Sequence, residues 1–113
     1  MKYEVTIKGT LPTFLNYDSE ESIQLACDCV EEYIKAYTKY AYESVEASYV
    51  GDGDLTITIR KIITSTEPPT VGEMEDEDRR SISIELLPAL NVIPFTSECY
   101  LQNLRITKVT PLP

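Results

Sequence analysis

The sequence predicts an α+β domain in which one long amphipathic helix packs on a mainly antiparallel sheet. Two observations support this class. Residues 18–43 repeat apolar side chains at helical spacing over about half of the helix circumference. Several other segments alternate apolar and polar residues, which is typical of strands that bury one face. One helix lying across one sheet is the simplest way to bury these faces together.

The elements are expected in the order β-α-β-β-β-β. Residues 2–8 alternate and predict a half-buried strand. The helix of residues 18–43 begins at Asp18 or at Ser19, because either side chain can cap the first N–H groups of a helix. Its acids come first and its lysines last, which is the distribution that the helix dipole favours.

Residues 44–61 predict a hairpin, and the apolar pattern selects its register. A two-residue loop would place apolar residues of one strand opposite polar residues of the other. A three-residue loop at residues 51–53 instead gives one apolar face, with Gly53 in the left-handed conformation. We therefore expect the second register, which pairs Leu55, Ile57 and Ile59 with Tyr49, Ala47 and Val45.

The second half of the chain is expected to hold an acidic loop, two strands and a short tail. Residues 64–78 are rich in proline, glycine and acids and lack periodicity, so they predict a long loop. Residues 79–87 alternate and predict a strand, with Ile82, Ile84 and Leu86 pointing inward. Residues 101–109 predict the last strand, and residues 110–113 form a C-terminal tail. The whole chain, residues 1–113, is expected to be a single domain.

The chain is acidic, and its excess charge is concentrated in two segments. The formal net charge is −9, from 10 basic and 19 acidic residues. Residues 18–50 carry eight acids and two lysines, residues 73–78 carry five acids, and the rest is slightly basic. Such a field repels nucleic acids and anionic membranes but attracts basic proteins. We therefore expect a protein partner with a basic surface, such as a nucleic-acid-binding enzyme, and no direct contact with nucleic acid or membrane.

The two acidic segments would form one surface if the acidic loop folded beside the N-terminal half of the helix. That surface is the candidate partner-binding site. Its carboxylates are those of Glu20, Glu21, Asp28, Glu31, Glu32, Glu73, Glu75, Asp76, Glu77 and Asp78. The alternative is that these charges only keep a small domain soluble.

Residues 86–95, LLPALNVIPF, are unusually apolar and are interrupted by two prolines. They either cover the end of the sheet as a buried loop or form an exposed patch that binds another protein or a second copy of the chain. The candidate residues of this apolar interface are Leu87, Leu90, Val92, Ile93 and Phe95.

No segment carries a catalytic, metal-binding or cofactor-binding pattern. The chain lacks histidine, which is the usual general base and the commonest metal ligand, and it has no glycine-rich phosphate loop. The GDGD turn of residues 51–54 lacks the further ligands of a calcium loop. No apolar stretch reaches the roughly 18 residues of a membrane span, and the N-terminus does not read as a signal peptide. Three cysteines, an odd number, indicate reduced thiols in the cytoplasm.

The sequence therefore predicts a small, non-catalytic, cytoplasmic binding protein without cofactor or metal. In size and charge it is similar to small inhibitors from phages and mobile elements, including anti-CRISPR proteins, whose carboxylates mimic nucleic acid and block a basic protein groove. The likeness involves no shared motif, so it assigns no residues. The alternative function is a structural or assembly module that self-associates through a sheet edge or through residues 86–95.

Overall fold

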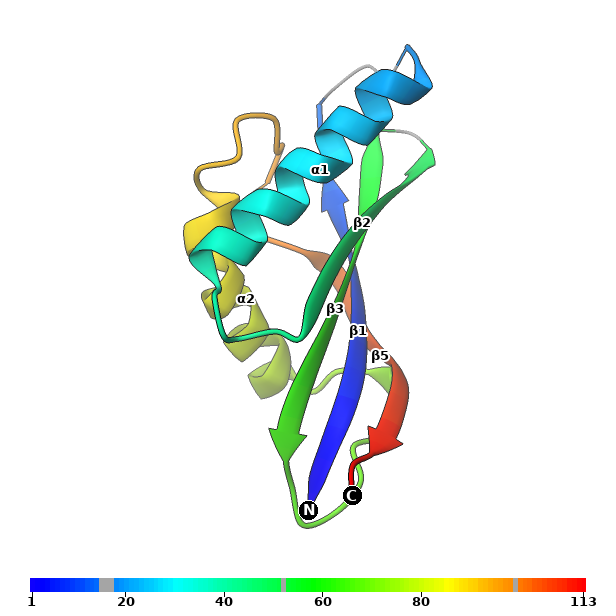
Figure 1. Cartoon of the computed structure of the whole chain (residues 1–113), viewed down its shortest axis with the longest axis vertical. Helices are drawn as coiled ribbons and strands as arrows, with labels where there is room; N and C mark the ends of the chain where they lie inside the picture. Colours follow the sequence, from blue (N-terminus) through cyan, green and yellow to red (C-terminus); the bar gives the residue numbers. More distant parts are fainter. Residues whose placement is uncertain (15–17, 52, 99) are drawn as a thin grey trace.

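Over the residues that it describes, 1–14, 18–51, 53–98 and 100–113, the computed structural model has two helices and a five-stranded antiparallel sheet (Figure 1). The elements are β1 (Lys2–Pro12), α1 (Glu20–Tyr37), β2 (Ser44–Gly51), β3 (Asp54–Thr64), β4 (Gly72–Glu73), α2 (Asp76–Leu90) and β5 (Gln102–Pro111). The strand order across the sheet is β2-β3-β1-β5-β4. The predicted α+β class and antiparallel sheet are confirmed, whereas the single helix and the order β-α-β-β-β-β are wrong.

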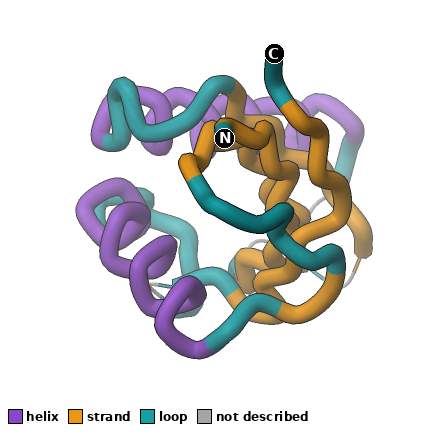
Figure 2. Tube along the Cα trace, turned by 90° about the horizontal axis from the view of Figure 1, so that it is seen from below, coloured by secondary structure: helices purple, strands orange, loops and turns teal. Residues whose placement is uncertain are grey.

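β1 is the central strand, and its alternation separates an apolar face of the sheet from a polar one. The core-facing residues of β1 are Tyr3, Val5, Ile7 and Leu11, all buried. α1 adds Cys27, Val30 and Ile34 to the core, and α2 adds Ile82, Leu86, Ala89 and Leu90. Both helices therefore pack on the same face of the sheet. Looking along the long axis, Figure 2 shows α1 across the top and α2 at the left, flanking the strands.

The main error of the sequence prediction is the strand expected at residues 79–87, which is part of α2. Ile82 and Leu86 are buried as predicted, but Ile84, expected to point inward, is 63% exposed. Residues four apart share a face in a helix and in a strand alike, so the short apolar pattern fits both. The acidic run itself indicated the start of a helix. Residues 76–78 form the first turn of α2, where the helix dipole favours negative charge.

The acidic loop expected at residues 64–78 is shorter in the structure. Residues 72–73 pair with β5 as β4, and the chain is helical from residue 76 onward. Only residues 65–71 connect β3 to β4. The C-terminal tail expected at residues 110–113 also begins later, because the backbone pairing of β5 with β1 continues to Pro111.

The predicted hairpin register is confirmed. The observed partners of Val45, Ala47 and Tyr49 are Ile59, Ile57 and Leu55. Gly53 has a φ of 80°, in the left-handed region where a side chain would be strained. Asp52, also part of the predicted loop, lies outside the described residues.

The N-cap of α1 is Ser19, one of the two predicted caps. Its hydroxyl oxygen accepts a hydrogen bond from the Ser22 N–H of the first turn at 3.1 Å. It ends at Tyr37, earlier than expected. The Thr38 hydroxyl donates to the Ile34 carbonyl, and Tyr40 adopts a φ of 74°, which is incompatible with a right-handed helix. Tyr40, which falls within the helix expected over residues 18–43, lies outside α1 and is 90% exposed.

Replacing Gly9 with alanine should destabilise the fold by about 1–3 kcal/mol, because β1 and β5 approach too closely for a side chain. A β-carbon at Gly9 would lie 2.9 Å from Leu104 Cδ2 and 3.1 Å from Leu101 Cβ. Urea denaturation measures the loss, with Ser48→Ala on the exposed side of β2 as control. Equal stabilities of the two variants would contradict this reading of the β1–β5 contact.

Candidate interaction surfaces

Four carboxylates of the predicted acidic site are exposed on α1: Glu20, Glu21, Asp28 and Glu32. At 100° per residue, Glu21, Asp28 and Glu32 lie within about 40° of one another on the helix wheel, so they form one row. The Asp28 carboxylate accepts a hydrogen bond from Gln24 Nε2 at 2.8 Å. None of the ion pairs between described residues involves a carboxylate of α1. We call Glu21, Asp28 and Glu32 the α1 row.

Glu31, the fifth predicted acid of α1, has a structural role. Its side chain is half-buried, and its carboxylate accepts a hydrogen bond from the Ala47 N–H at 2.8 Å. Because β2 is an edge strand, this N–H would otherwise point away from the sheet without a strand partner. Glu31 therefore covers part of the β2 edge and does not belong to a free acidic surface.

The remaining predicted acids lie around the start of α2. Glu73 belongs to β4, Glu75 is the N-cap residue, and residues 76–78 form the first helical turn. All of these acids are exposed. Asp76 forms an ion pair with Arg79, one turn further along the helix. Their position at a helix N-terminus stabilises α2, since carboxylates there offset the helix dipole.

The fold does not bring the two acidic groups together. In Figure 1, α1 begins at the top of the molecule, whereas α2 begins in the lower half and rises toward the C-terminal end of α1. The contacts between the helices are therefore made away from both acidic ends. The ten predicted carboxylates therefore form three sets. These are the α1 row with Glu20, the half-buried Glu31, and a separate group at the start of α2.

The predicted apolar interface is divided between the core and the surface. Leu90 and Ile93 are buried and Phe95 is partly buried against the core. Leu87 on α2 and Val92 just beyond its C-terminal end are exposed, and so is Ile84 on α2. Residues 86–95 are not a loop throughout, as one interpretation expected, because residues up to Leu90 belong to α2.

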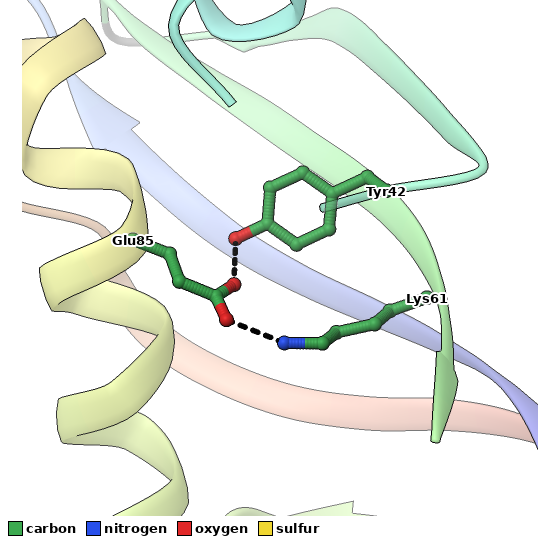
Figure 3. Close-up of polar contacts among 3 residues, drawn as sticks. All are labelled: Tyr42, Lys61 and Glu85. Carbon is green, nitrogen blue, oxygen red and sulfur yellow. Dashed lines mark hydrogen bonds and ion pairs between the residues drawn. The ribbon is translucent and has the colours of Figure 1, made fainter. Parts of the chain in front are cut away.

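A polar contact that sequence reasoning missed joins α2 to the sheet (Figure 3). The Glu85 carboxylate accepts hydrogen bonds from the Tyr42 hydroxyl at 2.7 Å and from Lys61 Nζ at 2.5 Å. The side chains of Lys61 and Glu85 are only 23% and 32% exposed. Burial, and then the hydrogen bond and charge of Glu85, raise the pKa of the Tyr42 hydroxyl above its ordinary value.

One signal for this contact was present in the sequence. In β3 the inward positions are odd-numbered, and Lys61 takes such a position between Ile59 and Ile63. A lysine on an apolar face needs an anionic partner, because burying an unpaired charge is costly. The identity of that partner depended on α2 being a helix, since only then does Glu85 point toward β3.

A half-open cavity of about 140 Å³ lies between the sheet and the N-terminal half of α2. Its lining is mainly apolar and comes from β1, β3, β5, α2 and the segment between β3 and α2. The polar lining residues are Lys61 on β3 and Asp78 and Ser81 on α2. Because Asp78 and Ser81 are exposed, we place the opening between α2 and the end of β3.

Cys27 and Cys29 are both free thiols. Burial, then Glu31 and Asp28, raise the pKa of the Cys27 thiol, and burial and then Glu32 raise that of Cys29. A raised pKa keeps a thiol protonated and makes it a poor nucleophile. Among the described residues, no group of three or more cysteines and carboxylates is placed to hold a metal ion.

No protein-family model matches the chain, and neither a curated protein nor a solved structure shows detectable similarity to it. In the part of the chain that the structure describes, neither helix is long and apolar enough to cross a membrane.

Replacing Tyr42 with phenylalanine should cost about 1 kcal/mol of stability at neutral pH, which is typical of one lost hydrogen bond. Because folding raises the pKa of Tyr42 above about 10, its stabilising effect is complete below pH 10 and is lost as the pH rises further. The difference in stability between wild type and Tyr42→Phe should therefore narrow above pH 10. Urea denaturation over a pH series measures it.

Tyr40→Phe is the matched control, because the Tyr40 side chain is almost fully exposed and should show no difference at any pH. A difference for Tyr42→Phe that stays constant above pH 10 would contradict the coupling between this hydroxyl and Glu85.

Proposed function

We propose that this chain is a small, non-catalytic binding protein that attaches to a basic surface of another protein through α1. The observation that carries the proposal is the α1 row, three carboxylates on one exposed side of a helix without cationic partners among the described residues. Neighbouring carboxylates repel one another, and a cationic surface on a partner would remove that repulsion. The poor nucleophilicity of Cys27 and Cys29 supports a non-catalytic role.

In its finer form, the proposal makes α1 a mimic of a nucleic-acid backbone. Nucleic-acid-binding grooves use lysine and arginine to contact phosphates. At 1.5 Å per residue, the α1 row extends along about 17 Å of the helix axis, so a groove of that kind could receive the helix lengthwise. The chain would then act as an inhibitor of a nucleic-acid-binding enzyme, as the inhibitors of phages and mobile elements do. The cytoplasm is the proposed setting, and the free thiols of Cys27 and Cys29 support it.

Reversing the charge of the α1 row, with Glu21→Lys, Asp28→Lys and Glu32→Lys together, should abolish binding to the basic partner. The reason is that attraction becomes repulsion along the whole row. The measurement is a pull-down from cell lysate with the tagged chain at low and at high salt, with the captured protein quantified. Wild-type capture should fall steeply as salt rises.

A second variant separates the α1 row from the overall charge. Glu75→Lys, Asp76→Lys and Glu77→Lys together change the net charge by the same amount at the start of α2, remote from the α1 row (Figure 1). This variant should keep the partner, provided that circular dichroism shows it folded. Equal loss of the partner in both variants, or wild-type capture that is insensitive to salt, would refute the role of the α1 row.

The second candidate function is a structural module that self-associates through α2. The specific observation in its favour is the exposure of three apolar side chains, those of Ile84 and Leu87 on α2 and of Val92 just after it. Light scattering should then show a dimer at high concentration that Leu87→Glu returns to a monomer. A monomer at every concentration would exclude this second function.

A further inference from the structure

The end of β3 is a sheet edge that none of the described strands covers. β2 begins opposite Arg60, so residues 61–64 of β3 pair only with β1. The next residue, Ser65, donates its N–H to the Met1 carbonyl at 3.0 Å. Because alternate residues of an antiparallel strand bond to opposite sides, Ile62 and Thr64 direct their N–H and C=O groups away from β1.

The other edges of the sheet carry protective features that this edge lacks. On the edge of β2, the Glu31 carboxylate accepts a hydrogen bond from the Ala47 N–H. β4 covers part of the edge of β5, which ends at Pro111, a residue without an N–H. After β3 the chain turns beneath the N-terminus toward β5 and does not return along the β3 edge (Figure 1). Between described residues, no backbone hydrogen bond is made across this edge beyond Arg60.

The cavity between α2 and the sheet lies directly beside this edge. Ile63, the residue between Ile62 and Thr64, faces the core side of the sheet and lines the cavity. Residues directly opposite each other on neighbouring strands point to the same face. A residue added opposite Ile63 would therefore direct its side chain toward the opening between β3 and α2. The volume of about 140 Å³ is close to that of apolar cavities that accept one benzene-sized group.

We propose that the end of β3 and this cavity bind an extended segment of another protein by strand addition. The backbone of that segment pairs with Ile62 and Thr64, and one aliphatic side chain enters the cavity opposite Ile63. Strand addition commonly combines these two elements, with affinity from backbone hydrogen bonds and specificity from a pocket for an alternate side chain. The site is separate from the α1 row, so it stands or falls independently of the proposed function.

A second copy of the chain fits this edge less well than a single extended segment. In a symmetric antiparallel pair, Ile63 would lie opposite Ile63 of the other copy, and that side chain already lines its own cavity. The two copies of α2 would also meet on the same face of the joined sheet, beside the joined edges. An extended peptide segment brings no helix with it and leaves the cavity free for its side chain.

The test is a titration of the ¹⁵N-labelled chain with the capped peptide acetyl-Gln-Thr-Leu-Thr-Gln-amide, followed by NMR. The expected result is saturable shifts at Ile62 and Thr64 and at cavity residues such as Ile82, with slower amide exchange at Ile62 and Thr64. The same peptide with alanine in place of leucine should bind at least about tenfold more weakly, because it leaves the cavity unfilled. The peptide methylated on both threonine nitrogens should not bind, because it cannot complete the backbone pairing.

Two variants on α2 locate the side-chain pocket. Ser81→Leu places an apolar side chain at the cavity opening and should weaken binding of the leucine peptide at least about tenfold. Arg80→Leu, one residue earlier and outside the cavity lining, is the matched control and should bind normally. The NMR spectrum of each variant shows whether it is folded.

Three outcomes would overturn the proposal. The first is no saturable shift up to the solubility limit of the leucine peptide. The second is binding that survives methylation of the threonine nitrogens, or shifts confined to the exposed residues of α2. The third is a dimer by light scattering in which Ile62 and Thr64 are already protected from exchange, because the edge would then belong to a second copy.

Discussion

The rest of the structure depends on one constraint, which is that only one of the two faces of the sheet is apolar. β1 lies at the centre of the sheet and buries every second residue, so only one face is apolar. Both helices must cover that face, since neither can bury its own apolar side elsewhere. In Figure 1, α1 crosses the upper half of the sheet and α2 stands to the left of the strands at mid-height, and the core is continuous beneath both helices.

Sharing one face also explains the polar contact and the cavity. Lys61 lies on the apolar face at the level where α2 crosses it, and Glu85 makes this position tolerable by accepting hydrogen bonds from Lys61 and Tyr42. Below this contact α2 and the sheet are incompletely packed, which leaves the cavity beside the end of β3. The uncovered edge and the pocket therefore lie together near the end of β3, whereas the α1 row lies on the other helix.

Much of the fold could be predicted from residue patterns, and the failures have physical causes. The register of the β2–β3 hairpin followed from its apolar residues, because a shift of one residue would turn them all to the other face. α2 was mistaken for a strand because the spacing of Ile82 and Leu86 fits a helix and a strand alike. Pro88 added to the error, because proline is unfavourable in the interior of a helix, where it nevertheless lies. Glu31 differs from the other candidate acids because it is half-buried, and its partner, the Ala47 N–H, is distant in sequence.

By itself, the sequence determined the α+β class, the hairpin register, the apolar face of β1 and the placement of excess charge in two segments. These features are local, since they depend on residue spacing and composition within single elements. Only the tertiary structure decided that the two acidic segments lie apart and that Glu85 contacts Lys61. It also decided that β3 extends beyond its pairing with β2, next to a cavity. Each of these depends on how far one element extends and where the next one packs, and residue spacing within an element carries no such information.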